Sequence, residues 1–242
     1  MNCKIIHFYP DLMNLYGSYA NLSALTRCLQ LLGHTVCAET VVPGGEADLS
    51  DADFVFMGAG TERSQKAALQ DLRRFAGQIK DLAEAGVPML FCGTAMDLLG
   101  KSISDGSATY ECLGLADFTC VQSERRQVID VYGHTDLFDE AIVGFLNKSS
   151  TISGVKTPLL RECLLGWGNE KDGQGEGVLI HNVMGSHLTG PLLMKNPRLL
   201  EHVVRLICAR RGAEVPSSLP HIQHMEEAYA TTEQQLRRRA EK

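Results

Sequence analysis

The chain has 242 residues, of which 44% are hydrophobic, and a formal net charge of -6 at pH 7. This length allows one main α/β core, and the mild acidic excess leaves no basic surface for nucleic acid. No apolar run approaches the roughly 18 residues that cross a bilayer, and the N-terminus lacks a signal-peptide pattern. We therefore expect a cytoplasmic protein with no nucleic-acid partner and no membrane insertion.

The eight cysteines are irregularly spaced and form neither a CxxC pair nor a disulfide-dense framework. This usage is typical of reduced cytosolic thiols. The histidines and cysteines show no zinc-ligand spacing; His221 and His224, three residues apart, are at most a weak metal pair. We expect no metal and no cofactor in this chain.

In the first half of the chain, short apolar runs alternate with longer amphipathic ones. The pattern predicts strands at 4–9, 36–42, 53–57 and 87–91 and helices at 14–32 and 65–85. The first helix carries leucines at spacings of three and four and stops at Gly33. Strands connected through helices predict a largely parallel sheet with helices on its faces.

Beyond about residue 115 the predicted strands are separated by Gly, Ser and Asp, which favours a partly antiparallel half. They lie at 118–131, 141–145, 164–168 and 177–184, followed by a helix at 197–211 and a charged helix at 221–242. A Pro/Ser break at 215–220 divides the chain into a main domain, 1–212, and a C-terminal linker and helix, 213–242.

The stretch PMLFCGTAMDLLG, residues 88–100, places Cys92 and Gly93 between a buried strand and a predicted helix. Sites in open α/β sheets gather at the carboxyl ends of the strands. Free N–H groups at a helix start stabilise a thiolate and can hold an oxyanion, which predicts a nucleophile. The alternative is a buried cysteine packed as a small hydrophobic residue.

Three further segments occur with this one in a specific linear order: DLMNLYG at 11–17, FVFMGAGTER at 54–63 and MGSHLTGPLL at 184–193. The set resembles the class I, CobB/CobQ-like glutamine amidotransferases, most closely their GatD-like members. The resemblance covers about residues 4–211. It implies a three-layer, flavodoxin-like α/β fold with a mostly parallel central sheet and an antiparallel extension.

The resemblance implies a glutaminase in which the thiolate of Cys92 attacks the side-chain amide of glutamine. The loop at Gly58 and Gly60, with the backbone of Gly93, would supply oxyanion donors. Arg126 matches an arginine that holds the glutamine α-carboxylate; its neighbour Arg125 and a merely solvated charge run remain alternatives.

The resemblance also implies a heterodimer with a MurT-like Mur ligase that amidates the D-glutamate of lipid II in peptidoglycan synthesis. ATP and Mg would belong to that partner, and the C-terminal helix could dock on it.

Several positions depart from the family pattern. Thr189 occupies the place of the catalytic histidine, and His187 stands two residues earlier; because i and i+2 share a strand face, His187 is a doubtful substitute. Ser18, Thr94 and Lys148 replace an acidic residue, a glycine and a histidine of the family. Two functions follow: a glutaminase subunit, or an inactive amidotransferase-like subunit with a binding or scaffolding role.

Overall fold

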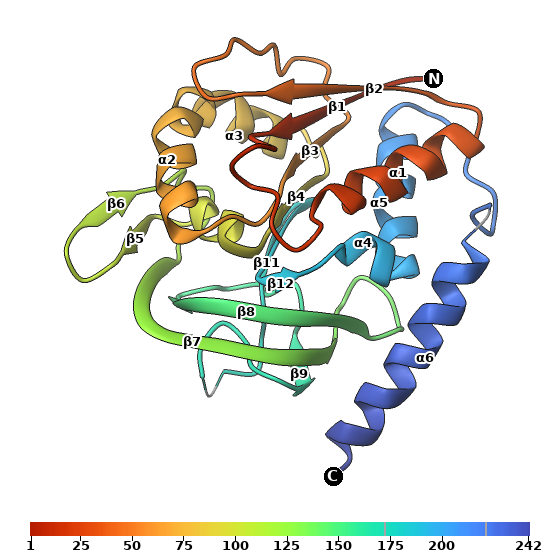
Figure 1. Ribbon diagram of the computed structural model, residues 1–242. Helices are drawn as coiled ribbons and strands as arrows, with labels where there is room; N and C mark the ends of the chain where they lie inside the picture. The colour runs from red at the N-terminus through yellow and green to blue at the C-terminus, as the bar shows by residue number, and fades with distance from the viewer. Residues whose placement is uncertain (172, 221) are drawn as a thin grey trace.

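The structure, a computed structural model, describes residues 1–171, 173–220 and 222–242 and has an α/β fold (Figure 1). Its main sheet has the strand order β10-β11-β4-β3-β1-β2. The strands are β1 (Asn2–Phe8), β2 (Thr35–Val41), β3 (Phe54–Met57), β4 (Met89–Cys92), β10 (Val178–Ile180) and β11 (Val183–Ser186). All neighbours pair in parallel except β10 with β11. The predicted parallel sheet is confirmed.

Helices cover both faces of this sheet. One face carries α1 (Tyr19–Leu31) and α5 (Pro197–Arg210); the other carries α2 (Glu62–Leu72), the 3₁₀ turn η1 (Arg73–Phe75) and α3 (Ala76–Glu84). Strand residues alternate between the two cores. In β4, Leu90 and Cys92 pack toward α1 and α5, whereas Met89 and Phe91 pack toward α2 and α3.

A second sheet, with strand order β12-β8-β7-β5-β6, lies beside the first and is mostly antiparallel. Its strands are β5 (Ser102–Ser104), β6 (Thr109–Glu111), β7 (Thr119–His134), β8 (Ile142–Ser153) and β12 (Leu188–Thr189), and β9 (Glu162–Leu165) pairs with β7. The long β7–β8 pair changes register between Gln122 and Gln127. This sheet is the antiparallel extension that the sequence predicts.

Several predicted boundaries are wrong for local reasons. The first helix begins at Tyr19, because Tyr16 and Gly17 adopt positive φ and the Asn14 side chain accepts the Tyr19 N–H. The predicted helix 65–85 is interrupted by η1, and the predicted strand 177–184 is the hairpin of β10 and β11. The helix after Cys92 is a 3₁₀ helix, η2 (Gly93–Leu99).

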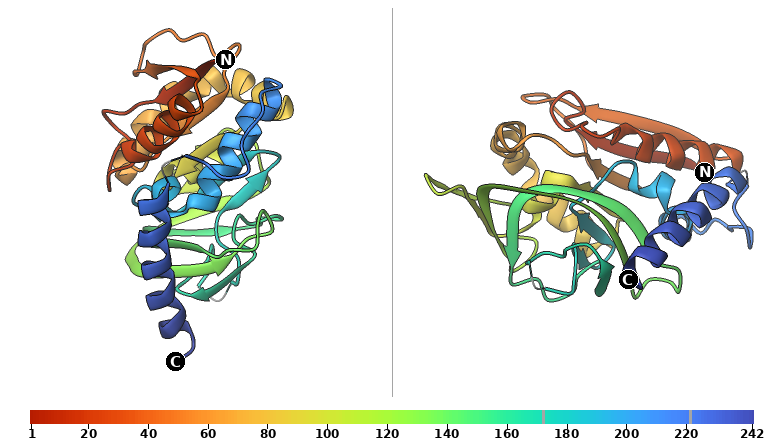
Figure 2. Two further views of the ribbon diagram at one scale, coloured as in Figure 1. Left: turned by 90° about the vertical axis from the view of Figure 1, so that its right-hand side faces the viewer. Right: turned by 60° about the horizontal axis from the view of Figure 1, so that its bottom comes forward.

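After the short helix α4 (Leu192–Lys195) and α5, the C-terminal helix α6 (Gln223–Ala240) runs down one side of the second sheet (Figures 1 and 2). Residue 221, at the start of the predicted terminal helix and half of the weak histidine pair, lies outside the described residues. Within the described ranges, no helix combines the length and the apolar character needed to cross a membrane.

Candidate functional site

Cys92 is the last residue of β4, at the carboxyl edge of the main sheet, but its side chain is fully buried. It belongs to the apolar core beneath α1 and α5. In the described part of the chain, its Sγ has one potential hydrogen-bond partner, the Asn21 amide nitrogen at 4.0 Å. The structure thus places the thiol at the predicted edge but away from solvent.

Burial raises the pKa of the Cys92 thiol well above its usual value, and the nearby carboxylate of Glu176 raises it further. The start of a 3₁₀ helix does not offset this desolvation. The lowered thiol pKa that the sequence predicted is therefore wrong for this state of the protein, in which the thiol stays protonated at neutral pH.

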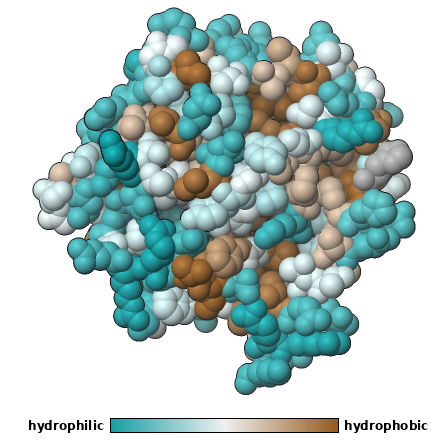
Figure 3. Space-filling view, in the orientation of Figure 1, coloured by the Kyte–Doolittle hydropathy of each residue, from teal (hydrophilic) through white to brown (hydrophobic). Residues whose placement is uncertain are grey.

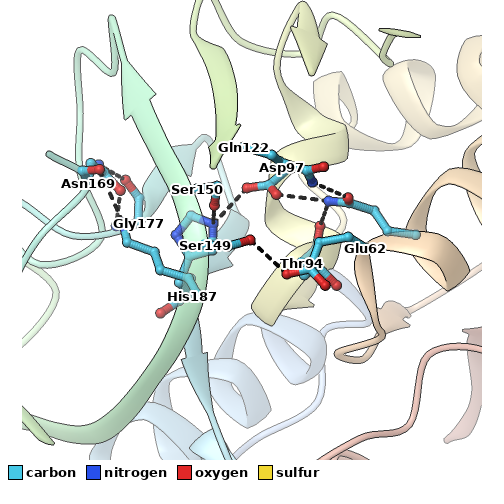
Figure 4. A network of polar contacts seen from close by, with 12 residues as sticks. Glu62, Thr94, Asp97, Gln122, Ser149, Ser150, Asn169, Gly177 and His187 are labelled. Carbon is cyan, nitrogen blue, oxygen red and sulfur yellow. Dashed lines mark hydrogen bonds and ion pairs between the residues drawn. The ribbon is translucent and has the colours of Figure 1, made fainter. Parts of the chain in front are cut away.

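His187, the doubtful second catalytic residue, does not hydrogen-bond to Cys92. Its Nε2 lies 2.6 Å from Asp97 Oδ1 and 3.3 Å from Ser150 Oγ. Its Nδ1 is buried, has no hydrogen-bond partner among the residues that the structure describes and lies 3.9 Å from Glu176 Oε1. The imidazole is thus held through Nε2 by Asp97 and Ser150 (Figure 4).

The chain path explains this orientation. His187 is the link between β11, which belongs to the main sheet, and β12, which belongs to the second sheet. The rule that i and i+2 share a face holds within one extended strand and does not transfer across this change of sheet. Thr189, in β12, donates its hydroxyl to Phe145 O at 2.9 Å and lines a small surface pocket.

A buried polar network surrounds His187. Gln65 donates to Asp97 Oδ2 at 2.8 Å and accepts from Gln122, while Glu176 accepts from the Ser186 hydroxyl and the His187 N–H, each at 2.7 Å. These contacts join α2, η2, β7 and β11 (Figure 4). The network satisfies most of its buried polar atoms internally and has the character of a structural core.

Lys148, which the resemblance places where a histidine is expected, is also buried. Its Nζ donates to Gly168 O at 2.8 Å and to Asn169 O at 3.1 Å. Burial lowers the pKa of Lys148, while Glu176 and Asp97 oppose that shift. The lysine therefore ties β8 to the loop after β9 instead of facing a substrate.

The loop after β3 is close to Cys92 through Gly93. A Cβ on Gly93, whose φ is +59°, would lie 2.6 Å from Ala59 Cβ, so the contact requires glycine. Of the predicted oxyanion donors, the Gly60 N–H is paired, since it donates to Thr94 Oγ1 at 3.1 Å. In the same loop the Ala59 N–H donates to Ser18 Oγ, also at 3.1 Å.

Arg126, on β7, lines the same pocket as Ala59 and Gly60. Its guanidinium is already paired with other side chains of this chain. It forms an ion pair with Glu62 and donates to Asn147 Oδ1 at 3.1 Å. Burial would raise the pKa of Glu62, but the Ser149 hydroxyl and Arg126 outweigh it and lower that pKa. Arg125 makes no side-chain hydrogen bond or ion pair within the described residues.

A pocket of about 70 Å³ lies at this loop, and a second pocket of about 430 Å³ shares Glu62 and Arg126 with it. The smaller pocket is lined by Leu15, Tyr16, Ala59, Gly60, Thr61, Glu62, Thr94, Arg126, Asn147 and Thr189. The structure thus gathers Gly60, Arg126, Thr94 and Thr189 at one opening, while Cys92 and His187 lie behind it and apart.

A family model described as the CobB/CobQ-like glutamine amidotransferase domain matches residues 4–197. The chain belongs to this family. A solved glutamine amidotransferase, 16% identical, superposes with a TM-score of 0.52 over 84% of this chain and 98% of its own. That likeness agrees with the α/β fold described above.

Two curated relatives extend the comparison over most of the chain. Both are GatD subunits of the lipid II isoglutaminyl synthase (glutamine-hydrolyzing). The one from Staphylococcus aureus (strain N315) is 30% identical over 210 residues, 86% of this chain and 85% of the relative. The one from Streptococcus pneumoniae (strain ATCC BAA-255 / R6) is 32% identical over 206 residues, 83% of this chain and 78% of the relative.

Asn21, Asp97 and Glu176 are central to the site of this CobB/CobQ-like chain but were missed in the sequence. Asp97 could have been found, since a lone carboxylate within the apolar run MDLLG must be paired if that run is buried. Nothing local marks Glu176, which lies in a glycine-rich loop and meets His187 through tertiary contact.

Proposed function

We propose that this CobB/CobQ-like chain is a GatD-like subunit that pairs with a MurT-like Mur ligase in amidation of the D-glutamate of lipid II, without hydrolysing glutamine itself. Its similarity to two GatD relatives over 78–85% of their length supports the family role. ATP and Mg would bind to the ligase. In the complex the chain would act through binding or scaffolding.

The observation that carries this proposal is the separation of the thiol from a base. A Cys–His reaction needs an imidazole nitrogen within hydrogen-bond reach of the thiol. Here Asp97 and Ser150 hold one nitrogen of His187, the other faces Glu176, and Thr189 cannot accept a proton near pH 7. The general-base contribution, about 10²- to 10⁴-fold in rate, would be missing.

A second candidate is glutamine hydrolysis through Cys92. It is favoured by the position of Cys92 at the carboxyl end of β4, beside Gly93 and the loop at Gly58–Gly60. In this reaction the thiolate would attack the side-chain amide of glutamine, ammonia would leave, and water would hydrolyse the glutamyl thioester. It requires a conformation in which the thiol becomes accessible and ionised.

Ammonia release from glutamine distinguishes the two candidates. The wild-type chain, Cys92→Ala and His187→Ala are assayed alone and with a MurT-like ligase, with a GatD subunit of a glutamine-hydrolysing enzyme as positive control. We expect no release above background from any of the three. Turnover by the wild type that is lost in Cys92→Ala would establish the glutaminase instead.

The scaffolding role has its own measurement. The ligase is supplied with free ammonium and its amidation rate is compared with and without this chain. We expect the chain to co-purify with the ligase and to raise ammonium-dependent amidation or ligase stability, equally with the wild type and Cys92→Ala. Absence of both association and effect would contradict the proposed partnership.

A further inference from the structure

Two side-chain hydroxyls accept hydrogen bonds from backbone N–H groups of the loop that follows β3. Ser18 Oγ accepts the Ala59 N–H at 3.1 Å and donates to Leu15 O at 2.8 Å. Thr94 Oγ1 accepts the Gly60 N–H at 3.1 Å and donates to Gly60 O at 3.0 Å. Leu15 N–H donates to Ala59 O, so both Ala59 and Gly60 have their N–H and C=O groups paired within the chain.

Such adjacent N–H groups, at the end of a parallel strand, are suited to hold a carbonyl or carboxylate oxygen. A hydroxyl oxygen at hydrogen-bond distance from the same N–H groups occupies the place that a ligand oxygen would take. We infer that Thr94, assisted by Ser18, closes an oxygen-binding site from within the chain and decides whether the pocket accepts a ligand.

The space around Thr94 agrees with this assignment. The pocket lined by Thr94 measures about 70 Å³, against roughly 300 Å³ or more for typical small-molecule sites. The Glu62–Arg126 ion pair and Thr189 form other parts of its lining. A few water molecules, each about 30 Å³, would fill it.

Removing the Thr94 side chain would free both polar groups of Gly60 and widen the pocket at the same point. The ligand class that then fits is an amide or a carboxylate, whose oxygen would accept the Gly60 N–H. This inference rests on the proposed function, since a chain that turns over glutamine must already offer these donors.

Three substitutions of Thr94 separate the effect of its hydroxyl group from the effect of its side-chain volume. Thr94→Ser keeps the hydroxyl, Thr94→Val keeps the volume without it, and Thr94→Ala removes both. Each variant is titrated with L-glutamine while the backbone amide signals of Ala59 and Gly60 are followed by NMR. Ser18→Ala frees the Ala59 N–H instead of the Gly60 N–H. It serves as a second variant with a freed backbone donor if Thr94→Ala does not fold.

We expect a saturable shift of the Gly60 amide in Thr94→Ala, with binding about tenfold tighter than in the wild type, as one gained hydrogen bond predicts. Thr94→Ser should behave as the wild type. The inference would be overturned if the wild type binds glutamine at Gly60 as tightly as Thr94→Ala does. It would also be overturned if Thr94→Ala and Ser18→Ala fold but neither binds glutamine.

Ammonia release measured on the same samples keeps the two proposals separate. Binding by Thr94→Ala without turnover supports both. Turnover by the wild type overturns the proposed function, whatever the amide signals show. No binding by Thr94→Ala or Ser18→Ala, together with no turnover by the wild type, overturns the inference about Thr94 alone.

Discussion

At the residue scale, Cys92 and Cys37 occupy opposite environments: Cys92 is fully buried, whereas Cys37 on β2 is exposed. A thiol must be ionised and accessible to react. With iodoacetamide at pH 8 we expect Cys37 to be alkylated first and Cys92 only on unfolding. Peptide mass spectrometry of timed samples measures both, and Cys37 serves as the internal control. Comparable rates for the two thiols would contradict the buried placement of Cys92.

Asp97 makes the second residue-scale prediction, since it is fully buried and bonds both His187 and Gln65. Asp97→Ala would leave two buried polar side chains without this partner and should lower the free energy of unfolding by about 3 kcal/mol. Urea denaturation followed by circular dichroism measures the change.

The exposed i, i+4 pair Lys80–Glu84 supplies the matched control for Asp97. Glu84→Ala should change the free energy of unfolding by no more than about 0.5 kcal/mol, because solvent screens such pairs. Equal effects of Asp97→Ala and Glu84→Ala would show that the buried network contributes little to stability.

At the element scale, α6 is attached to the second sheet by apolar packing, by hydrogen bonds and by an ion pair between Arg239 and Asp130. Leu236 is buried, Tyr229 donates its hydroxyl to Ala141 O at 2.7 Å and Tyr132 donates to Glu233 at 2.9 Å. Leu236→Ala should destabilise this attachment by about 2–3 kcal/mol through lost burial. Hydrogen exchange should then become faster throughout α6 while β4 stays protected.

Gln235, the exposed neighbour of Leu236, provides the control for that experiment. Gln235→Ala should leave exchange in α6 unchanged. If Leu236→Ala instead accelerates exchange equally in β4 and α6, the helix belongs to the same cooperative unit as the main sheet.

At the scale of the whole molecule, buried thiols should make the free energy of unfolding decrease as the pH rises in the alkaline range. Burial raises the pKa of Cys28 to about 11 and of Cys3 and Cys112 to about 12, from about 9 when unfolded. Above pH 9 the unfolded chain therefore releases protons that the folded chain retains. Stability should be complete below pH 9 and fall by about 1.4 kcal/mol per pH unit for each such thiol.

Urea denaturation between pH 8 and pH 10.5, under reducing conditions and at constant ionic strength, measures this slope. Cys37→Ser is the control, because solvent already surrounds this side chain in the folded protein. It should leave the slope unchanged. Stability that rises between pH 9 and pH 10.5 would contradict the burial of these thiols.

The space-filling view shows how polar and apolar residues are distributed on one face of the molecule. In Figure 3 polar residues cover most of the visible face, while apolar residues gather between α1, α4 and α5. Met194 and Tyr19 are among the large apolar side chains exposed on these helices. The visible surface thus combines a mostly polar face with an apolar area on these helices.

The sequence by itself determined the parallel sheet, the antiparallel extension and the position of Cys92 at a strand end. These features depend on apolar periodicity and on chain order, which are local and readable. The motif order also indicated the family, and the resemblance by itself places Thr189 where a histidine is expected.

Only the tertiary structure decided the chemical state of the site. Whether Cys92 meets solvent depends on α1 and α5, and the orientation of His187 depends on a change of sheet and on Asp97, 90 residues away in sequence. Desolvation and long-range pairing set the charge of a group, and neither is encoded in the residues next to it.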